Sequence, residues 1–369
     1  MHLAAVSENY GHFYVPAFAV RVDGLDLLQE YTVAITQAEV DLTLGGAGRF
    51  SFTVANAFDP KIRDFRTGDA AGQDLLDVLA FGAPIEIAMG YGDRGSLKPP
   101  LIQGVVTQIT TDFPESGTPE LVVSGYDHAF PMMGGKISDN WSNQRDSEVV
   151  GQIARRNNLE ADVVRTEVEL DQTNQNQESD LEFVNKLAER NGYETYVTGK
   201  TLRFGPPQNT GSGIVTLEWG KGLLSFKPDG NLVGQISGVE VYGWNPKTKD
   251  KIVGKASHGE ESGRDQQRDS AGDRLARLLR DQPVLRVRQP VFTQAEATQR
   301  ARAILKQRSE EFLTGEGETI GLPELRPDRN VTLQGLGRKF SKTYYVREIT
   351  HRFDGNGYRT RFKIKESTL

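Results

Sequence analysis

The sequence contains no cysteine, no long hydrophobic run and no excess of basic residues. Without cysteine the chain has no disulfide bond, no thiolate nucleophile and no cysteine-ligated zinc or iron–sulfur site. No stretch approaches the roughly 18 consecutive apolar residues of a transmembrane helix. Residues 1–18 also lack a basic segment followed by an apolar one, which a secretory signal would need. We therefore expect no membrane span and synthesis in a cytoplasm.

The charge balance argues against nucleic acid as the main partner. Lysine and arginine number 44, aspartate and glutamate number 50, and the formal net charge is −6. Nucleic-acid binding depends on clustered basic residues that neutralise phosphates. The length of 369 residues exceeds the size at which a single hydrophobic core stops growing, so we expect two or three domains.

Candidate nucleotide and metal motifs lack residues that their chemistry requires. The G-K-T triplet at 199–201 would need a glycine five residues earlier, where Glu194 stands, and it leads into a strand pattern, whereas a phosphate loop opens a helix. A calcium loop over 171–182 would have Asn176 in place of the glycine that makes its sharp turn. We expect no metal and no cofactor.

Catalytic patterns are also missing from the sequence. No G-x-S-x-G nucleophile motif occurs. A lone histidine is more often packed or solvated than a ligand, and the five histidines stand alone, at His2, His12, His128, His258 and His351. Two carboxylates distant in sequence could still act in glycoside hydrolysis. A carbohydrate-binding or cell-wall-degrading β protein therefore stays open as the alternative function.

Residues 1–130 read as an antiparallel β domain. The segments 17–24, 32–44 and 49–56 alternate apolar and polar residues and are separated by Gly and Asp turns. The same pattern returns between residues 84 and 127. This alternation predicts a sheet with one buried face and one wet face.

Residues 131–207 change to helical spacing, which indicates a small inserted α/β domain. Ser179 and Glu182 form a capping box at the start of a helix, and Asp180 lies in the first turn, where the helix dipole favours negative charge. Gly192 follows the last apolar residue of the helical pattern, as a C-terminal cap does.

A hairpin follows that helix. Its two strands are expected at 193–197, beginning with Tyr193, and at 201–204, and Gly199 lies at the turn between them, where positive φ is needed. These structural roles explain the cluster of acidic residues and glycines without an active site.

Residues 208–369 return to β patterns, with two helices inserted. The first helix is expected near 273–281, with Leu275, Leu278 and Leu279 on one face. The second is expected from Thr293 to about residue 312, with Thr293 and Glu296 as a capping box. A hairpin around residues 354–357 ends the region.

The two β regions resemble each other. Each contains a strand ending in glycine, a long strand ending in I-T-x-x-F, a glycine turn and a return strand. This predicts two copies of one β domain, and the matching residues at one constant offset are Ile109, Thr110, Phe113 and Gly117 with Ile349, Thr350, Phe353 and Gly357. The alternative is that any two hairpins share such a sequence pattern without being copies of one domain.

Two segments resemble the phage late control protein D family of baseplate hub proteins. The first is Q-x-x-E-S-D-L-E-F-V-x-x-L-A-E-R-N-G-Y-E followed by T-L-R-F-G-P-P, over residues 175–207. The second is G-L-G-R-K-F-S-K-T-Y-Y-V-R-E-I-T-H-R-F-D-G-N-G-Y-R-T-R-F, over residues 335–362. We take as structural signature residues Ser179, Asp180, Glu182, Gly192, Tyr193, Gly199, Gly337, Tyr345, His351 and Gly357.

The resemblance implies a mainly β (α+β) fold with two antiparallel β-barrel domains like those of tail tubes, at 1–130 and 208–369, around the inserted domain at 131–207. It implies a homotrimeric hub that joins the hexameric inner tube to the central spike and contacts other baseplate proteins. It also implies assembly in the bacterial cytoplasm, within a virion tail or injection-system particle. The chain is similar to the hub part of VgrG proteins without their spike, so a separate spike protein and no enzymatic activity are expected.

Overall fold

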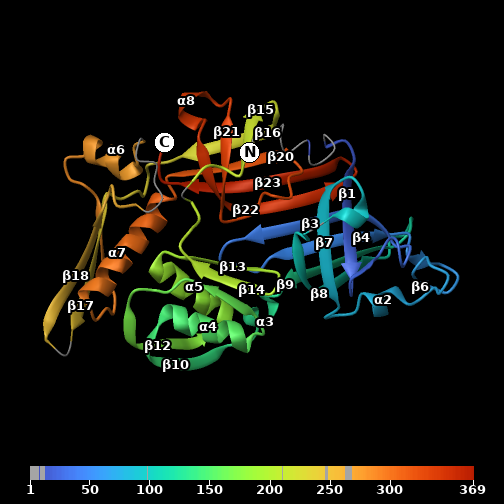
Figure 1. Cartoon of the computed structure of the whole chain (residues 1–369), viewed down its shortest axis with the longest axis horizontal. Coiled ribbons are helices and arrows are strands. Elements are labelled where there is room, and N and C mark those ends of the chain that lie inside the picture. Colours follow the sequence, from blue (N-terminus) through green and yellow to red (C-terminus); the bar gives the residue numbers. More distant parts are fainter. Residues whose placement is uncertain (1–7, 9–12, 98, 210, 246–247, 262–267) are drawn as a thin grey trace.

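The computed structural model describes residue 8 and residues 13–97, 99–209, 211–245, 248–261 and 268–369 (Figure 1). The fold is mainly β, as the sequence predicts, and most of its strands belong to one 13-stranded sheet. Among the described helices, none combines the length and apolar character of a membrane span.

The first β region forms one half of this sheet. Its alternating sequence directs aromatic and β-branched side chains to one face, where Phe50, Phe52 and Val123 are fully buried. In pairing order its strands are β2 (Leu25–Asp26), β1 (Pro16–Val22), β7 (Pro84–Tyr91), β8 (Ile102–Asp112), β9 (Glu120–Asp127), β4 (Arg49–Ala55) and β3 (Ala34–Thr43). Its connections hold β5 (Phe58–Asp59), β6 (Asp64–Phe65), α2 (Leu75–Val78) and η2 (Arg94–Ser96).

The second β region closes into a six-stranded barrel around Leu333, Tyr344 and Phe362. Around the ring its strands are β15 (Val215–Trp219), β16 (Gly222–Gly230), β20 (Leu313–Ile320), β23 (Gly357–Glu366), β22 (Thr343–Asp354) and β21 (Arg329–Gln334), which pairs with β15 again. The described strands of the first region show no ladder from β1 to β3, so its sheet is open there. Closure into a barrel therefore holds for one of the two predicted barrels.

The two β regions nevertheless share one strand order. The series β1, β7, β8, β9, β4, β3 corresponds to β15, β21, β22, β23, β20, β16. Both long hairpins carry a register shift at equivalent places, between 106 and 108 in β8 and between 346 and 348 in β22. The internal repeat predicted from the sequence is present in the topology, with one difference: β1 runs antiparallel to β7, whereas β15 runs parallel to β21.

The inserted α/β unit lies below the large sheet in Figure 1. Two helices pack together there and bury Val150, Ile153, Val184 and Leu187 completely. Its elements are α3 (Phe130–Met133), β10 (Ile137–Arg145), α4 (Asp146–Arg156), β11 (Glu160–Val163), β12 (Glu169–Glu178), α5 (Asp180–Asn191), β13 (Glu194–Thr198) and β14 (Thr201–Gly205).

A separate three-stranded sheet projects from the second β region, at the left of Figure 1. Helix α7 packs on it, and Ala297, Ala301 and Val241 belong to one buried cluster. Its elements are β17 (Gly238–Asn245), β18 (Asp250–Ser257), β19 (Val284–Arg288) and α7 (Gln294–Ser309). Two further helices in the region are α6 (Ala271–Leu278) and α8 (Gly337–Phe340).

Two details of the predicted helices are wrong. Leu275 is buried, but Leu278 and Leu279 are 68% and 45% exposed, because α6 ends at Leu278 and the chain then leaves the helical face. Thr293 does cap α7 by accepting the Glu296 N–H (3.1 Å), but the Glu296 carboxylate accepts from the N–H before the cap. The capping box at Thr293 is therefore not reciprocal.

Candidate functional site

The two β regions join edge to edge through β3 and β22. Residues 38–43 pair antiparallel with residues 348–353, so one sheet runs through both regions (Figure 1). On the buried face of this ladder, Phe353 lies 4.5 Å from Phe18 of the first core, measured between ring centroids. The ladder therefore packs a side chain of one region against the core of the other.

The outward face of the same ladder carries matched polar side chains. Thr350 donates a hydrogen bond to the carboxylate of Asp41 (2.7 Å). Arg352 lies 3.6 Å from Glu39, also directly across the ladder. Cross-strand pairs of this kind fix the register of two strands.

A buried ionic cluster ties the inserted unit to the second β region. Glu194 of β13 accepts from Lys306 of α7 (3.0 Å) and from Arg347 of β22 (2.6 Å), and Glu310 lies 3.3 Å from Lys306. Burial alone would lower the pKa of Lys306, but the carboxylates of Glu310 and Glu194 outweigh it and raise that pKa. Two cations and two carboxylates thus compensate one another in a largely buried cluster.

Asp328 is a second buried link between these parts. Its carboxylate accepts from the hydroxyls of Tyr345 (2.7 Å) and Tyr196 (3.2 Å) and from the backbone N–H of Gln208 (2.7 Å). Burial raises the pKa of Tyr196 to about 12, and it raises the pKa of Tyr345 further, so both hydroxyls stay protonated and donate. Tyr345, one of the signature residues, therefore acts in packing at this junction.

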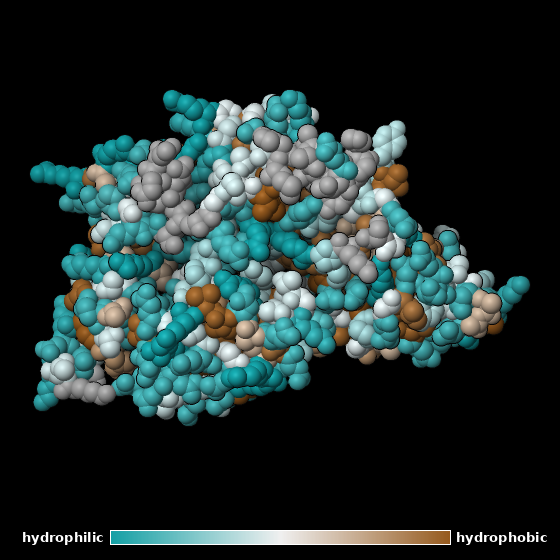
Figure 2. All heavy atoms as spheres, in the orientation of Figure 1, coloured by the Kyte–Doolittle hydropathy of each residue, from teal (hydrophilic) through white to brown (hydrophobic). Residues whose placement is uncertain are grey.

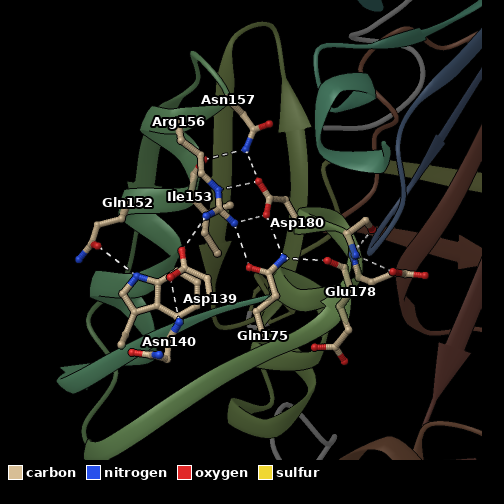
Figure 3. A network of polar contacts seen from close by, with 12 residues as sticks. Asp139, Asn140, Gln152, Ile153, Arg156, Asn157, Gln175, Glu178 and Asp180 are labelled. Carbon is tan, nitrogen blue, oxygen red and sulfur yellow. Dashed lines mark hydrogen bonds and ion pairs between the residues drawn. The ribbon is translucent and has the colours of Figure 1, made fainter. Parts of the chain in front are cut away.

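A polar network surrounds Asp180 at the start of α5 (Figure 3). Arg156 contacts both oxygens of the Asp180 carboxylate, while Asn157 (2.7 Å) and Gln175 (3.0 Å) also donate to it. Burial raises the pKa of Asp180, but these hydrogen bonds together hold it below its usual value. The ionised Asp180 carboxylate, with both oxygens hydrogen-bonded, holds α4, α5 and β12 together. Such a carboxylate is unsuited to proton transfer.

The capping residues of α5 lie where the sequence places them. The Ser179 hydroxyl accepts from the N–H of Glu182 (3.2 Å), and the Glu182 carboxylate accepts from the N–H of Ser179 (2.7 Å). Gly192 ends the helix in the left-handed region (φ 68°). Tyr193 donates to the carbonyl of Arg165 (3.3 Å).

Of the remaining signature glycines, Gly199 lies in the β13–β14 turn, while Gly337 begins α8 and Gly357 begins β23. Gly199, Gly337 and Gly357 have φ of 56°, 75° and 93°, which a residue without Cβ adopts at little cost. The signature residues therefore lie in separate places, at the inserted unit, at the junction and at the closing hairpin. They do not converge on one pocket.

His351 is packed inside the barrel, as predicted for a lone histidine. It is fully buried, with its Nδ1 2.8 Å from the Tyr358 hydroxyl and its Nε2 3.1 Å from the carbonyl of Leu325. Burial lowers the pKa of His351 to about 3, so the imidazole is neutral at physiological pH. No three described His, Asp or Glu side chains are grouped to hold a metal ion.

Asp127 is a buried carboxyl beside a cavity of about 120 Å³, which lies between both β regions and the β13–β14 hairpin. Its oxygens accept from the backbone N–H groups of Gly48 (2.7 Å) and Ala129 (2.9 Å). Burial nevertheless raises the pKa of Asp127 to about 7. This carboxyl is sensitive to pH in the neutral range.

Solved structures with the same fold are phage tail proteins and a relative from a secretion system. A 43 kDa tail protein of prophage MuSo2 from Shewanella oneidensis is 14% identical, with 95% of this chain and 98% of that chain covered and a TM-score of 0.69. A tail protein from Neisseria meningitidis MC58 is also 14% identical, with 96% and 97% covered and a TM-score of 0.66. The E. coli c3393 protein is 13% identical, with 94% and 76% covered and a TM-score of 0.56.

The third of these is described as a component of the type VI secretion system with structural similarity to the T4 bacteriophage tail proteins gp27 and gp5. At such low identities the likeness establishes a shared fold. No curated protein matches the sequence.

A family model described as the Alg8 N-terminal domain matches residues 58–354, more than three quarters of the chain. The chain belongs to the Alg8 N-terminal domain family. The range matched by the Alg8 N-terminal domain starts at β5 and ends with β22, so it includes the whole inserted unit and the β22 edge that pairs with β3.

Within that range lies a second repeat that the sequence analysis missed. Eight residues are identical between 146–163 and 180–197, in the pattern D-x-E-x-V-x-x-x-A-x-R-N-x-x-E-x-x-V. Each copy begins at a helix, α4 or α5, and ends in a strand, β11 or β13. Comparing the two helical patterns with each other would have found it.

The repeat explains the polar network, because the two copies bind each other reciprocally. Asp180 of the second copy is held by Arg156 and Asn157 of the first. The equivalent Asp146 of the first copy is held by Arg190 and Asn191 of the second. The inserted unit is therefore a pseudo-symmetric pair of helices, each with its first-turn carboxylate bound to the end of the other.

Proposed function

We propose that this chain is the structural baseplate hub of a contractile phage tail or a related injection system, a homotrimer that joins the hexameric inner tube to the central spike. The observation that carries the proposal is the repeated strand order of the two β regions, which lie side by side in one continuous sheet. Three such chains present six similar β units, which is the number needed to face a hexameric ring.

Two further observations support this role. The fold is shared with tail proteins along nearly the whole chain. The segments 175–207 and 335–362 resemble the late control protein D family, and the residues that match it hold the inserted unit and the second β region in place. We further propose a division into domains at 1–130, 131–207 and 208–369, with the first and last as tube-like units.

Co-purification with candidate partners tests the adaptor role. The tagged chain is mixed with candidate inner-tube and spike proteins, and the complexes are isolated and imaged. A particle with tube protein on one face and spike on the other is expected. Failure to retain either partner would contradict the adaptor role.

The same preparation tests the carbohydrate alternative. We expect no release of fragments from purified peptidoglycan. Hydrolysis that one Asp or Glu substitution abolishes would replace the hub proposal with an enzymatic one.

A further inference from the structure

Among the described strands, β8 and β16 each have an unpaired edge. These edges are equivalent, in the repeat, to the edges of β22 and β3 that pair within the chain. In the first region, β8 pairs with β7 only through residues 102–105, so its edge at 108–112 faces no described strand. In the second region, β16 contacts β15 only at its start, so its edge at 225–230 faces no described strand. Unpaired edges of this length favour pairing with another chain.

The internal repeat relates these open edges to the paired ones. Residues 108–113 of β8 are the counterparts of 348–353 of β22, at the offset of the sequence repeat. The register shift between 35 and 37 in β3 recurs between 223 and 225 in β16, which aligns 38–43 with 226–231. One open edge is therefore equivalent to β22, and the other is equivalent to β3.

We propose that β8 of one copy pairs antiparallel with β16 of a second copy of this chain, in the register of the β3–β22 ladder. This inference rests on the proposed trimeric hub and specifies its contact. Transferring the register sets Thr110 opposite Asp229 and Asp112 opposite Lys227. Each copy offers one edge of each kind, so the contact is head-to-tail, and in the proposed trimer three such contacts close a ring.

Side chains on both open edges fit this register. Thr110 and Asp229 repeat the chemistry of the Thr350–Asp41 hydrogen bond. Asp112 and Lys227 repeat the opposite-charge Arg352–Glu39 pair with its signs exchanged. Each of these four residues of the open edges is exposed in the single chain and available to a partner.

The buried face of the proposed ladder also has its counterpart. Phe353 packs against the neighbouring core across β3, whereas its equivalent Phe113 is 60% exposed, with its ring edge-on to Phe58 of its own region (5.5 Å between centroids). Phe226 lies opposite Phe113 in the transferred register. One feature differs: Pro228 has no N–H, so this ladder has one hydrogen bond fewer than its counterpart within the chain.

Disulfide trapping tests the register directly, because the chain has no native cysteine. Leu44 N–H donates to the carbonyl of Arg347 (3.2 Å), so these two residues form a hydrogen-bonded pair of the β3–β22 ladder. Hydrogen-bonded and non-hydrogen-bonded pairs alternate along an antiparallel ladder, so residues 41 and 350, three positions away, form a non-hydrogen-bonded pair. Such a pair has Cα atoms about 4.5 Å apart, within the range that a disulfide spans. The variant Asp41→Cys/Thr350→Cys should therefore close a disulfide within the chain and serves as the positive control.

The test variant is Thr110→Cys/Asp229→Cys, which should give a covalent trimer on a non-reducing gel after mild oxidation. A mixture of the two single variants should give covalent dimers, while each single variant alone gives none. The out-of-register control Thr110→Cys/Lys227→Cys sets the two cysteines diagonally, about 7–8 Å apart, and should crosslink poorly.

The outcomes separate this inference from the proposed function. If the chain is a trimer in solution but the control variant forms the disulfide as well as the test variant or better, the proposed pairing is wrong and the trimeric hub stands. The same holds if the chain is a trimer and neither variant forms the disulfide. A chain that is monomeric alone and with its partners overturns both.

A charge exchange gives a second measurement that does not depend on cysteine geometry. Asp112→Lys should weaken the trimer by setting two lysines across the ladder, and adding Lys227→Asp should restore it. If neither the single nor the double substitution changed the dissociation of the trimer, the proposed register would be contradicted.

Discussion

Three buried carboxylates hold parts of the chain together, one within the inserted unit and two between that unit and the second β region. Asp180 joins elements within the inserted unit, while Glu194 and Asp328 link that unit to the second β region. Removing one partner of a buried ion pair costs more than the pair contributes, because the other charge is left without compensation. These residues are therefore sensitive points for stability.

Glu194→Gln tests the ionic cluster. The substitution leaves Lys306 and Arg347 with Glu310 as their remaining carboxylate, and we expect a loss of about 3 kcal/mol in the free energy of unfolding. Glu218→Gln is the matched control, since Glu218 pairs with Lys221 at the surface, where about 0.5 kcal/mol or less is expected. Denaturant unfolding of both variants measures the difference. Equal effects would show that the buried cluster has no special weight.

Asp127 gives a prediction about pH. In the folded chain its pKa is about 7, whereas the ordinary value is 3.8, so between these values the unfolded chain releases a proton that the folded chain keeps. Lowering the pH therefore stabilises the fold relative to a variant without this carboxyl. From pH 8 to pH 5.5 the stability of the native chain should rise by about 2 kcal/mol relative to Asp127→Asn.

Thermal or denaturant unfolding of both proteins at several pH values checks this. Other groups, including the neutral buried His351, contribute equally to both proteins and cancel in the difference. A difference that stays constant across the range would contradict the raised pKa of Asp127.

At the scale of elements, the end of α5 tests the turn chemistry. Gly192 has a φ of 68°, and a Cβ there would lie 3.8 Å from Ala303, so space is available and the cost is in the backbone. A β-branched residue in this conformation costs roughly 2 kcal/mol. Gly192→Val should accordingly lower the melting temperature and the soluble yield.

The pseudo-symmetric inserted unit supplies the matched control. Asn158, which occupies the position equivalent to Gly192 after α4, has a φ of 57°. Gly192→Asn should therefore lose much less stability than Gly192→Val, because asparagine tolerates the left-handed region. An unchanged melting temperature in the valine variant would refute the role of this glycine as a cap.

The sequence was sufficient for features that depend on local residues. The capping box at Ser179, the strand alternation and the repeat of the long hairpins all follow from spacing, and they are present in the structure. The exposed Leu278 and Leu279 show the limit of helical spacing, since the pattern does not show where the helix ends.

Contacts between distant segments could not be predicted in this way. The β3–β22 ladder joins residues far apart in the chain, and an edge strand has the same alternation whether its partner is in the same chain or in another. The reciprocal carboxylate network was not predicted for a different reason. Its repeat lies within the inserted unit and has a much shorter offset than the repeat of the β regions.

At the scale of the whole molecule, two β units with one strand order share a single sheet, and each unit keeps one edge open. The face in Figure 2 is mostly hydrophilic, with hydrophobic residues in small separate patches. Assembly by strand edges suits this face better than assembly by a broad apolar interface. The proposed trimer would satisfy every copy of these two edges at once.

The mass of the chain in solution tests the account most directly. Light scattering behind a sizing column should give three times the 40.8 kDa of the chain when it is alone, or that mass plus the mass of bound spike protein when the spike is present. A mass of one chain under every condition, including in the presence of tube and spike proteins, would contradict the trimeric hub.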